Sequence, residues 1–158
     1  MTDSASEAKL YALRLLGYRG RSERELRDRL DRKGFRPDLI NRTVLQLKQA
    51  GLIDDVALAA NLRRLAFERR LLGHKGARSF MLKRGLPLSV VESALDYDEE
   101  TDLENAVRFL DKKRTSMENY TAVERKRKLW NLLARRGYSP GVIRKAMRDF
   151  NFDEEDGQ

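Results

Sequence analysis

Few side chains in this sequence could act as an acid, a base or a nucleophile near neutral pH. The chain contains one histidine and no cysteine, which excludes a cysteine nucleophile and leaves almost no ligands for a zinc site. The histidine, His74, lies between glycines in the segment 72–76, where we expect a loop and a surface side chain. The sequence contains no glycine-rich phosphate-binding loop. It also contains no nucleophile and general base at a recognisable sequence spacing. The sequence therefore predicts a protein that is not an enzyme and that needs no metal or cofactor.

Two adjacent carboxylates, Asp54 and Asp55, are the remaining candidates for metal binding. They also stand immediately before a segment with helical periodicity. Asp54 suits the N-cap position, and Asp55 suits the first turn, where the helix dipole favours negative charge. We favour this capping interpretation over a metal site.

The chemistry that the sequence does offer is positive charge. Lys and Arg number 33 against 25 Asp and Glu, a net charge of +8, which favours a polyanionic partner. The basic excess lies in residues 1–53, 54–95 and 116–152, whereas residues 96–115 and 153–158 are acidic. We take the densest basic clusters as candidate binding residues: Arg63, Arg64, Arg69, Arg70, Lys75, Arg78, Lys83, Arg84, Arg125, Lys126, Arg127 and Lys128.

Lys and Arg are also good helix formers that commonly cover solvated faces. Phosphate contact needs only positive charge on one side of a rigid scaffold, so we favour nucleic-acid binding. No base-reading or stacking motif accompanies these residues, and we expect weak, sequence-independent binding to single- and double-stranded DNA. Consecutive helical positions are about 100° apart, so at least two of residues 125–128 should be exposed, and the core should not need these cations.

These basic clusters belong to a pattern that occurs three times, aligned on Gly34, Gly85 and Gly137. Two basic residues precede each glycine, an aromatic residue or leucine follows it, and apolar residues recur at matching offsets on both sides. Such spacing predicts one face of a helix, a break, and one face of a second helix. The glycine itself predicts a C-terminal cap with positive φ, and the basic pairs complement the helix dipole.

A third helix precedes each of these pairs. Capping boxes of the form Ser/Thr-x-x-Glu place helix starts at Ser4, Ser22, Ser89, Thr101 and Thr121. With the apolar periodicity they predict helices over residues 5–17, 22–33, 37–50, 55–72, 75–84, 88–95, 101–114, 121–136 and 140–149. The predicted fold class is all-α, an elongated array of three tandem three-helix repeats.

The repeat period predicts boundaries along the chain. The repeats are residues 1–53, 54–95 and 96–152, followed by an acidic tail, 153–158, that we expect to be disordered. The linker 51–55 is tight and partly apolar, whereas the linker 96–100 is acidic, so we expect the second joint to be looser. Apolar runs are short and the first residues are polar, so we expect a cytoplasmic monomer without a membrane span or signal peptide.

Ordered motifs link the chain to a known family. They are SERELRDRLDRKG from Ser22, GLIDD from Gly51, KRGL from Lys83 and RGYS from Arg136. In this order and spacing, over residues 8–150, the chain resembles the RecX family of bacterial recombinase regulators. The resemblance implies a modular string of three-helix units.

The resemblance also implies a function. It implies a regulator that binds the filament of RecA recombinase on DNA and inhibits strand exchange, ATP hydrolysis and coprotease activity. The residues alone leave two other classes open. One is a general DNA- or RNA-binding helical array that does not depend on the recombinase. The other is a scaffold that binds an acidic protein without nucleic acid.

Overall fold

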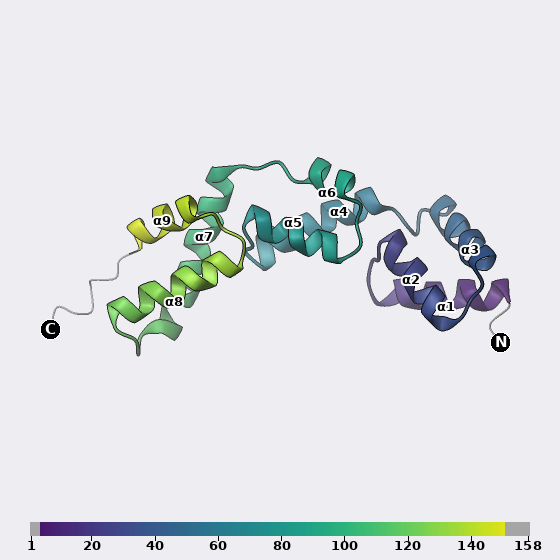
Figure 1. Cartoon of the computed structure of the whole chain (residues 1–158), viewed down its shortest axis with the longest axis horizontal. Helices are drawn as coiled ribbons and strands as arrows, with labels where there is room; N and C mark the ends of the chain where they lie inside the picture. The colour runs from purple at the N-terminus through teal and green to yellow at the C-terminus, as the bar shows by residue number, and fades with distance from the viewer. Residues whose placement is uncertain (1–3, 151–158) are drawn as a thin grey trace. The chain divides into compact units, whose positions relative to one another are not determined.

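The computed structural model describes residues 4–150, and every regular element within this range is helical (Figure 1). The α-helices are α1 (Ala5–Tyr18), α2 (Glu23–Lys33), α3 (Pro37–Gln49), α4 (Asp55–Arg64), α5 (His74–Lys83), α6 (Leu88–Ala94), α7 (Glu99–Lys113), α8 (Ala122–Arg135) and α9 (Pro140–Asp149). A π-helical turn, η1 (Leu65–Arg69), follows α4, and a 3-10 turn, η2 (Thr115–Met117), follows α7. The predicted all-α repeat fold is confirmed. Between residues 4 and 150, no helix has the length and apolar composition needed to cross a membrane.

Local capping chemistry explains most of the helix starts. The side chains of Ser4, Ser22 and Thr121 accept hydrogen bonds from backbone N–H groups three residues later, as predicted. The predicted caps at Ser89 and Thr101 are wrong, because both residues lie inside helices. The N-cap of α7 is Asp98, whose carboxylate accepts from the backbone of Glu100 at 3.2 Å and from the Thr101 hydroxyl at 2.6 Å.

The repeated glycines end α2, α5 and α8 in one common way. Gly34, Gly85 and Gly137 have φ values of 99°, 86° and 93°, as the sequence predicts. The N–H of the residue after each glycine bonds to the carbonyl five positions earlier, which is the Schellman arrangement. The side chains that flank this turn are buried: Leu30 with Phe35, Met81 with Leu86, and Leu133 with Tyr138. The repeat therefore encodes a helix end and the apolar contact that holds it.

Contacts divide the chain into two compact units. The first contains the described residues up to Leu62 together with Met81–Ala94, and the second contains Arg63–Phe80 together with the described residues from Leu95 onward. The division crosses α4 and α5, so each unit includes part of the middle predicted repeat. The three-repeat boundaries stay a prediction, and the predicted acidic tail, 153–158, lies outside the described residues.

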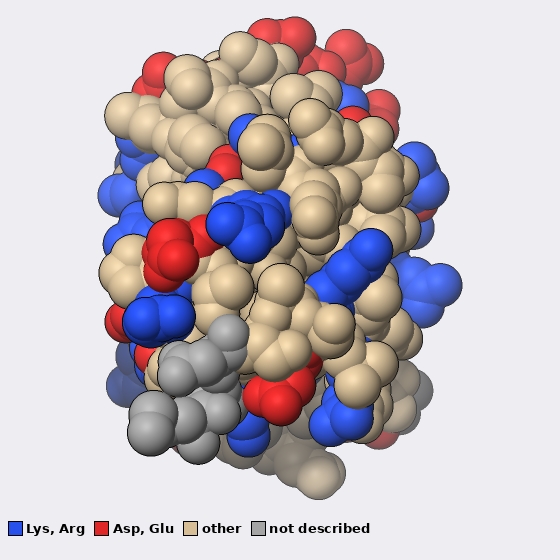
Figure 2. Space-filling view, turned by 90° about the vertical axis from the view of Figure 1, so that its right-hand side faces the viewer, with Lys and Arg blue, Asp and Glu red and all other residues tan. Residues whose placement is uncertain are grey.

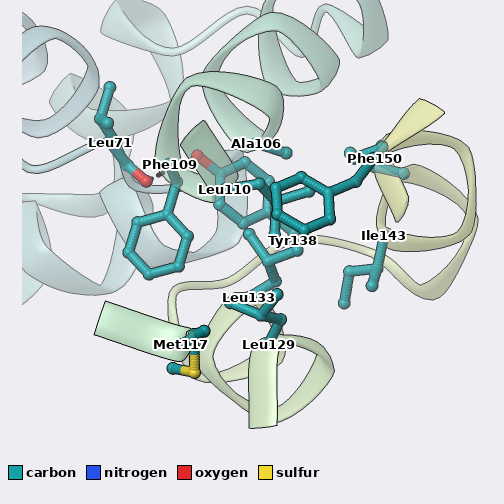
Figure 3. Close-up of a cluster of buried hydrophobic side chains, with 12 residues drawn as sticks. Leu71, Ala106, Phe109, Leu110, Met117, Leu129, Leu133, Tyr138, Ile143 and Phe150 are labelled. Atoms are coloured by element: carbon teal, nitrogen blue, oxygen red, sulfur yellow. Dashed lines mark hydrogen bonds between the residues drawn. The ribbon is translucent and has the colours of Figure 1, made fainter. Parts of the chain in front are cut away.

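Each unit has its own apolar core. In the first unit, α1, α2 and α3 pack on one another around buried side chains that include Leu26, Leu30 and Val44. In the second unit, α7 and α8 both pack on α9, and the core includes Phe109, Leu129 and Ile143 (Figure 3). The regular helix periodicity therefore produces one buried stripe per helix, and the remaining faces carry most of the charge.

Candidate nucleic-acid interface

Several of the basic residues are positioned by two joints with a similar pattern of hydrogen bonds. Joint 1, within the first unit, is formed where the segment before α2 meets the end of α5. The Ser22 hydroxyl donates to the carbonyl of Arg84 at 2.7 Å, and Arg84 Nη2 donates to the carbonyl of Gly20 at 2.9 Å. The first N–H of α2, on Glu23, donates to the carboxylate of Asp55 at 3.0 Å. Asp54 caps α4 and Asp55 lies in the first turn of α4, both as predicted, and the Asp55 carboxylate also caps α2.

Joint 2, within the second unit, repeats this arrangement where the segment before α5 meets the end of α8. The N–H of Gly73 donates to the carbonyl of Arg136 at 3.0 Å, and Arg136 Nη1 donates to the carbonyl of Arg70. The first N–H of α5, on His74, donates to the carboxylate of Asp102 at 3.1 Å. Arg84 and Arg136 both directly precede an aligned glycine, so the sequence repeat carries the joint as well as the helix end.

One further hydrogen bond fastens joint 2. The Tyr138 hydroxyl donates to the carbonyl of Leu71 at 2.6 Å, and both residues are buried (Figure 3). Leu71 has a φ of 50°, a left-handed conformation that is unfavourable for leucine. A Cβ atom at Gly73 would lie 2.7 Å from the carbonyl of Gly137, so the two backbones are in direct contact. The linker 96–100, where the sequence predicted the looser of two connections, is exposed. The contacts of joint 2 give no reason for a looser connection there.

Joint 2 borders a groove lined largely by arginine, which we call the arginine groove. Its volume is about 570 Å³, and it is lined by Arg69, Arg70, Leu72, Leu132, Arg135 and Arg136. The guanidinium of Arg70 lies 4.5 Å from the ring centroid of Phe80, and that of Arg136 lies 4.5 Å from the centroid of Phe109. Two of the four guanidinium groups are thus held against aromatic rings, and the residues Arg69, Arg70 and Arg135 are exposed.

A second hollow adjoins the arginine groove along α8, and we call it the tyrosine hollow. Its volume is about 380 Å³, and it is lined by Met117, Tyr120, Arg127, Lys128, Asn131, Leu132 and Arg135. Leu132 and Arg135 line both spaces, so the two lie side by side. Lys128 Nζ lies 4.5 Å from the centroid of the Tyr120 ring. Among the described residues, no carboxylate lines either space.

The predicted binding residues are only partly brought together. Arg69, Arg70, Arg127 and Lys128 line the two spaces in the second unit. Five others are exposed but line neither space: Arg63, Arg64, Lys75, Arg78 and Lys126. Lys83 and Arg84 border a mixed hollow in the first unit, which also contains the carboxylates of Glu25 and Asp28. Charge is mixed on other surfaces too, since Figure 2 shows lysine and arginine interspersed with carboxylates and uncharged residues.

The expectation that the core does not need the cations of residues 125–128 is wrong for Arg125. Its side chain is buried, with 8% of the residue exposed, and it lies among the residues of α8 that face inward. Lys126 and Arg127 are exposed, so the predicted minimum of two exposed cations is confirmed. A helix that turns by about 100° per residue cannot expose four consecutive side chains.

The prediction that His74 lies in a loop is also wrong. His74 is the first residue of α5, its side chain is half-buried, and its ring lies edge-on to Tyr97 with centroids 5.4 Å apart. Burial raises the pKa of Asp102, which accepts the His74 N–H, whereas the hydrogen bond from Thr101 lowers the pKa of Asp98. Within residues 4–150, no group of three or more His, Cys, Asp or Glu side chains could hold a metal ion. The arrangement at joint 2 is that of a helix cap.

Three residues that line the two spaces were not among the predicted binding residues: Arg135, Arg136 and Tyr120. The two arginines were interpreted only as complements to the helix dipole, and Tyr120 precedes α8 in a short loop. One signal was available: Arg136 aligns with Arg84 in the repeat, which indicates a position with a shared structural role.

Comparisons with known proteins agree with this architecture. Residues 8–47 match the family model for the first three-helix domain of RecX, and residues 100–147 match that for its third three-helix domain. The regulatory protein RecX of Chlorobium limicola is 32% identical over 145 residues, covering 91% of this chain and 89% of that protein. The regulatory protein RecX of Bacillus mycoides is 27% identical over 99% of this chain, which spans 58% of that protein. A crystal structure of RecX from Lactobacillus salivarius has the same fold, with a TM-score of 0.75 at 23% identity over 91% of this chain and 94% of that one.

Proposed function

The chain belongs to the RecX family of regulatory proteins, and on that premise we propose that it binds the RecA–DNA filament and inhibits the recombinase. Inhibition would extend to strand exchange, to filament-dependent ATP hydrolysis and to coprotease activity. A recombinase filament is a long, repetitive ligand, and a chain of similar helical units offers several similarly built surfaces to it. The activity is regulatory, and the proposal requires no catalysis by this chain. Because the filament forms in the cytoplasm, we propose that the protein acts there.

The arginine groove is the feature of the structure that best supports the proposed contact with DNA in the filament. Four guanidinium groups face one space of about 570 Å³, and two of them are held in place by aromatic rings. Guanidinium groups bind phosphate oxygens in a planar, bidentate geometry, and groups that are already ordered lose less entropy on binding. The groove is therefore suited to a phosphodiester backbone.

The same groove favours a second candidate function. A general DNA- or RNA-binding array would use these arginines without any contact with the recombinase. The two functions differ in what limits inhibition. A DNA-binding array inhibits by occupying DNA, so additional DNA relieves the inhibition. A filament regulator inhibits by binding the filament, so its inhibition depends on the amount of filament and not on the amount of free DNA.

A strand-exchange assay titrated with this protein tests the proposal. We expect product formation to fall progressively as the protein is added to preformed filaments, and we expect the ATPase rate of RecA to fall in parallel. The matched measurement adds excess DNA that RecA does not coat, and inhibition should persist. Unchanged strand exchange and ATP hydrolysis at saturating protein would contradict the proposal, and full relief by excess DNA would favour the general DNA-binding function.

A further inference from the structure

We propose that the tyrosine hollow and the arginine groove form one binding site for single-stranded DNA. In this site the groove holds consecutive phosphates, and Tyr120 stacks on an unpaired base. The inference rests on the proposed function, since it assigns the DNA contact of a filament regulator to particular side chains. It also adds a preference for unpaired nucleotides, which positive charge alone does not produce.

The phosphate half of the site is built from the four arginines of the groove. Among the described residues, none of the four groove arginines pairs with a carboxylate. Arg136 is fixed by its bond to the Arg70 carbonyl and by the ring of Phe109. Arg135 Nε donates to the carbonyl of Asn131 at 3.4 Å, which leaves its terminal nitrogens for a ligand. By contrast, Arg84 Nε, the counterpart of Arg136 in joint 1, lies 3.8 Å from the carboxylate of Glu25.

The base half of the site combines an aromatic ring, an amide and apolar side chains. Tyr120 is 38% exposed, and the Lys128 side chain is positioned over its ring face. A lysine side chain is long and flexible, so a base can replace it on the ring while its ammonium moves to a phosphate. Met117 and Leu132 give the hollow an apolar wall, and the exposed amide of Asn131 can both donate to and accept from a base edge.

The geometry favours single strands because of what each half requires. The groove needs only phosphates, which duplex and single strands both provide. Tyr120 needs the face of a base, and in a duplex those faces are stacked on their neighbours. Loss of the tyrosine ring should therefore weaken binding to single strands and leave duplex binding unchanged.

The first test measures fluorescence anisotropy of a labelled oligo-dT and of a labelled hairpin duplex, with the full chain at fixed salt. We expect Tyr120→Ala to weaken oligo-dT binding about ten-fold, since stacking contributes about 1–3 kcal/mol per base, and to leave duplex binding within two-fold. Tyr120→Phe keeps the ring and should bind as the wild type does. Tyr18, which is 79% exposed on α1, provides the control variant Tyr18→Ala, which should change neither affinity.

The second test addresses the phosphates through salt dependence. Replacing Arg69 and Arg135 by glutamine should reduce the slope of log K against log salt on oligo-dT by about 1.4, from about 0.7 per phosphate contact. The control replaces the exposed residues Arg32 and Arg42 by glutamine, which changes the net charge equally and should leave the slope nearly unchanged.

Several results would overturn the inference. Wild-type oligo-dT affinity in a folded Tyr120→Ala protein would do so, as would an equal loss on oligo-dT and duplex. An equal slope change in both arginine pairs would show that net charge, and not this groove, binds the phosphates. These assays contain no recombinase, so they can fail while the strand-exchange assay still shows inhibition. The reverse result, DNA binding at this site without an effect on RecA, would reject the proposed function alone.

Discussion

The hydrogen bond from Tyr138 to the carbonyl of Leu71 provides a direct measure of how strongly joint 2 is fastened. Tyr138→Phe removes one oxygen atom and keeps the ring in the core of the second unit. The bond is short, at 2.6 Å, and the carbonyl belongs to a residue that is only 2% exposed. Burial raises the pKa of Tyr138 well above that of a free phenol, so the hydroxyl stays protonated and continues to donate at all ordinary pH values.

The expected loss follows from the carbonyl that is left without this donor. An unsatisfied buried acceptor costs about 1–3 kcal/mol. For a chain of this size each kcal/mol shifts the melting temperature by about 2–4 °C, so the variant should melt roughly 2–12 °C lower. The left-handed backbone of Leu71 is held partly by this bond, which places the loss toward the upper half of the range.

Trp130, the sole tryptophan, makes the assay specific to the correct unit. It packs against the core that contains Tyr138 and Leu71, so its fluorescence during urea unfolding reports on the second unit. Tyr18→Phe removes a hydroxyl from an exposed ring and should change stability by less than about 0.5 kcal/mol. If Tyr138→Phe is as stable as this control, the joint is not fastened by the hydroxyl and the reasoning is wrong.

Three further predictions concern charge and shape. Because burial raises the pKa of Asp102, its contribution to stability is full below the ordinary value of 3.8 and is lost as the pH rises through the raised pKa. Asp102→Asn keeps an acceptor for the first N–H of α5, so its melting temperature should increase relative to that of the wild type as the pH rises through the raised pKa. A difference in melting temperature that does not change with pH would refute this. Arg125→Glu should destabilise the chain by about 3 kcal/mol or more, because it removes a buried cation and places a carboxylate in a buried position. The exposed Lys126→Glu should change stability by less than about 0.5 kcal/mol, and circular dichroism during thermal melting compares the two variants. Small-angle scattering should give a monomer with a radius of gyration well above about 15 Å, the compact value for this length, and a value near 15 Å would contradict the elongated array.

The sequence predicts the helices well because their signals are local. The glycine caps and the Ser22 and Thr121 caps depend on residues within five positions of one another, which periodicity and capping patterns capture. The start of α5 was predicted one residue late, which left His74 in a loop, for the opposite reason. Its first N–H is capped by Asp102, 28 residues away, so no cap residue stands next to His74 in the sequence.

The candidate site was predictable only in part. Charge density selected Arg69 and Arg70, but it could not show that they share a groove with Arg135 and Arg136, because joint 2 brings together segments 66 residues apart. Charge density also could not separate the buried Arg125 from its exposed neighbours, since that distinction depends on which face of α8 meets the core. Tyr120 was missed because it lies upstream of the basic run and meets Lys128 only through the turn into the helix.

Capture of this protein on immobilised RecA, with and without DNA, tests the central claim most directly. If the protein regulates the filament, it should be retained strongly by RecA assembled on DNA, and more strongly than by the same DNA alone or by RecA without DNA. Retention by DNA alone at the level of the filament would indicate a general nucleic-acid-binding array. Retention by RecA regardless of DNA would indicate a scaffold for an acidic protein, and either result would contradict filament-specific regulation.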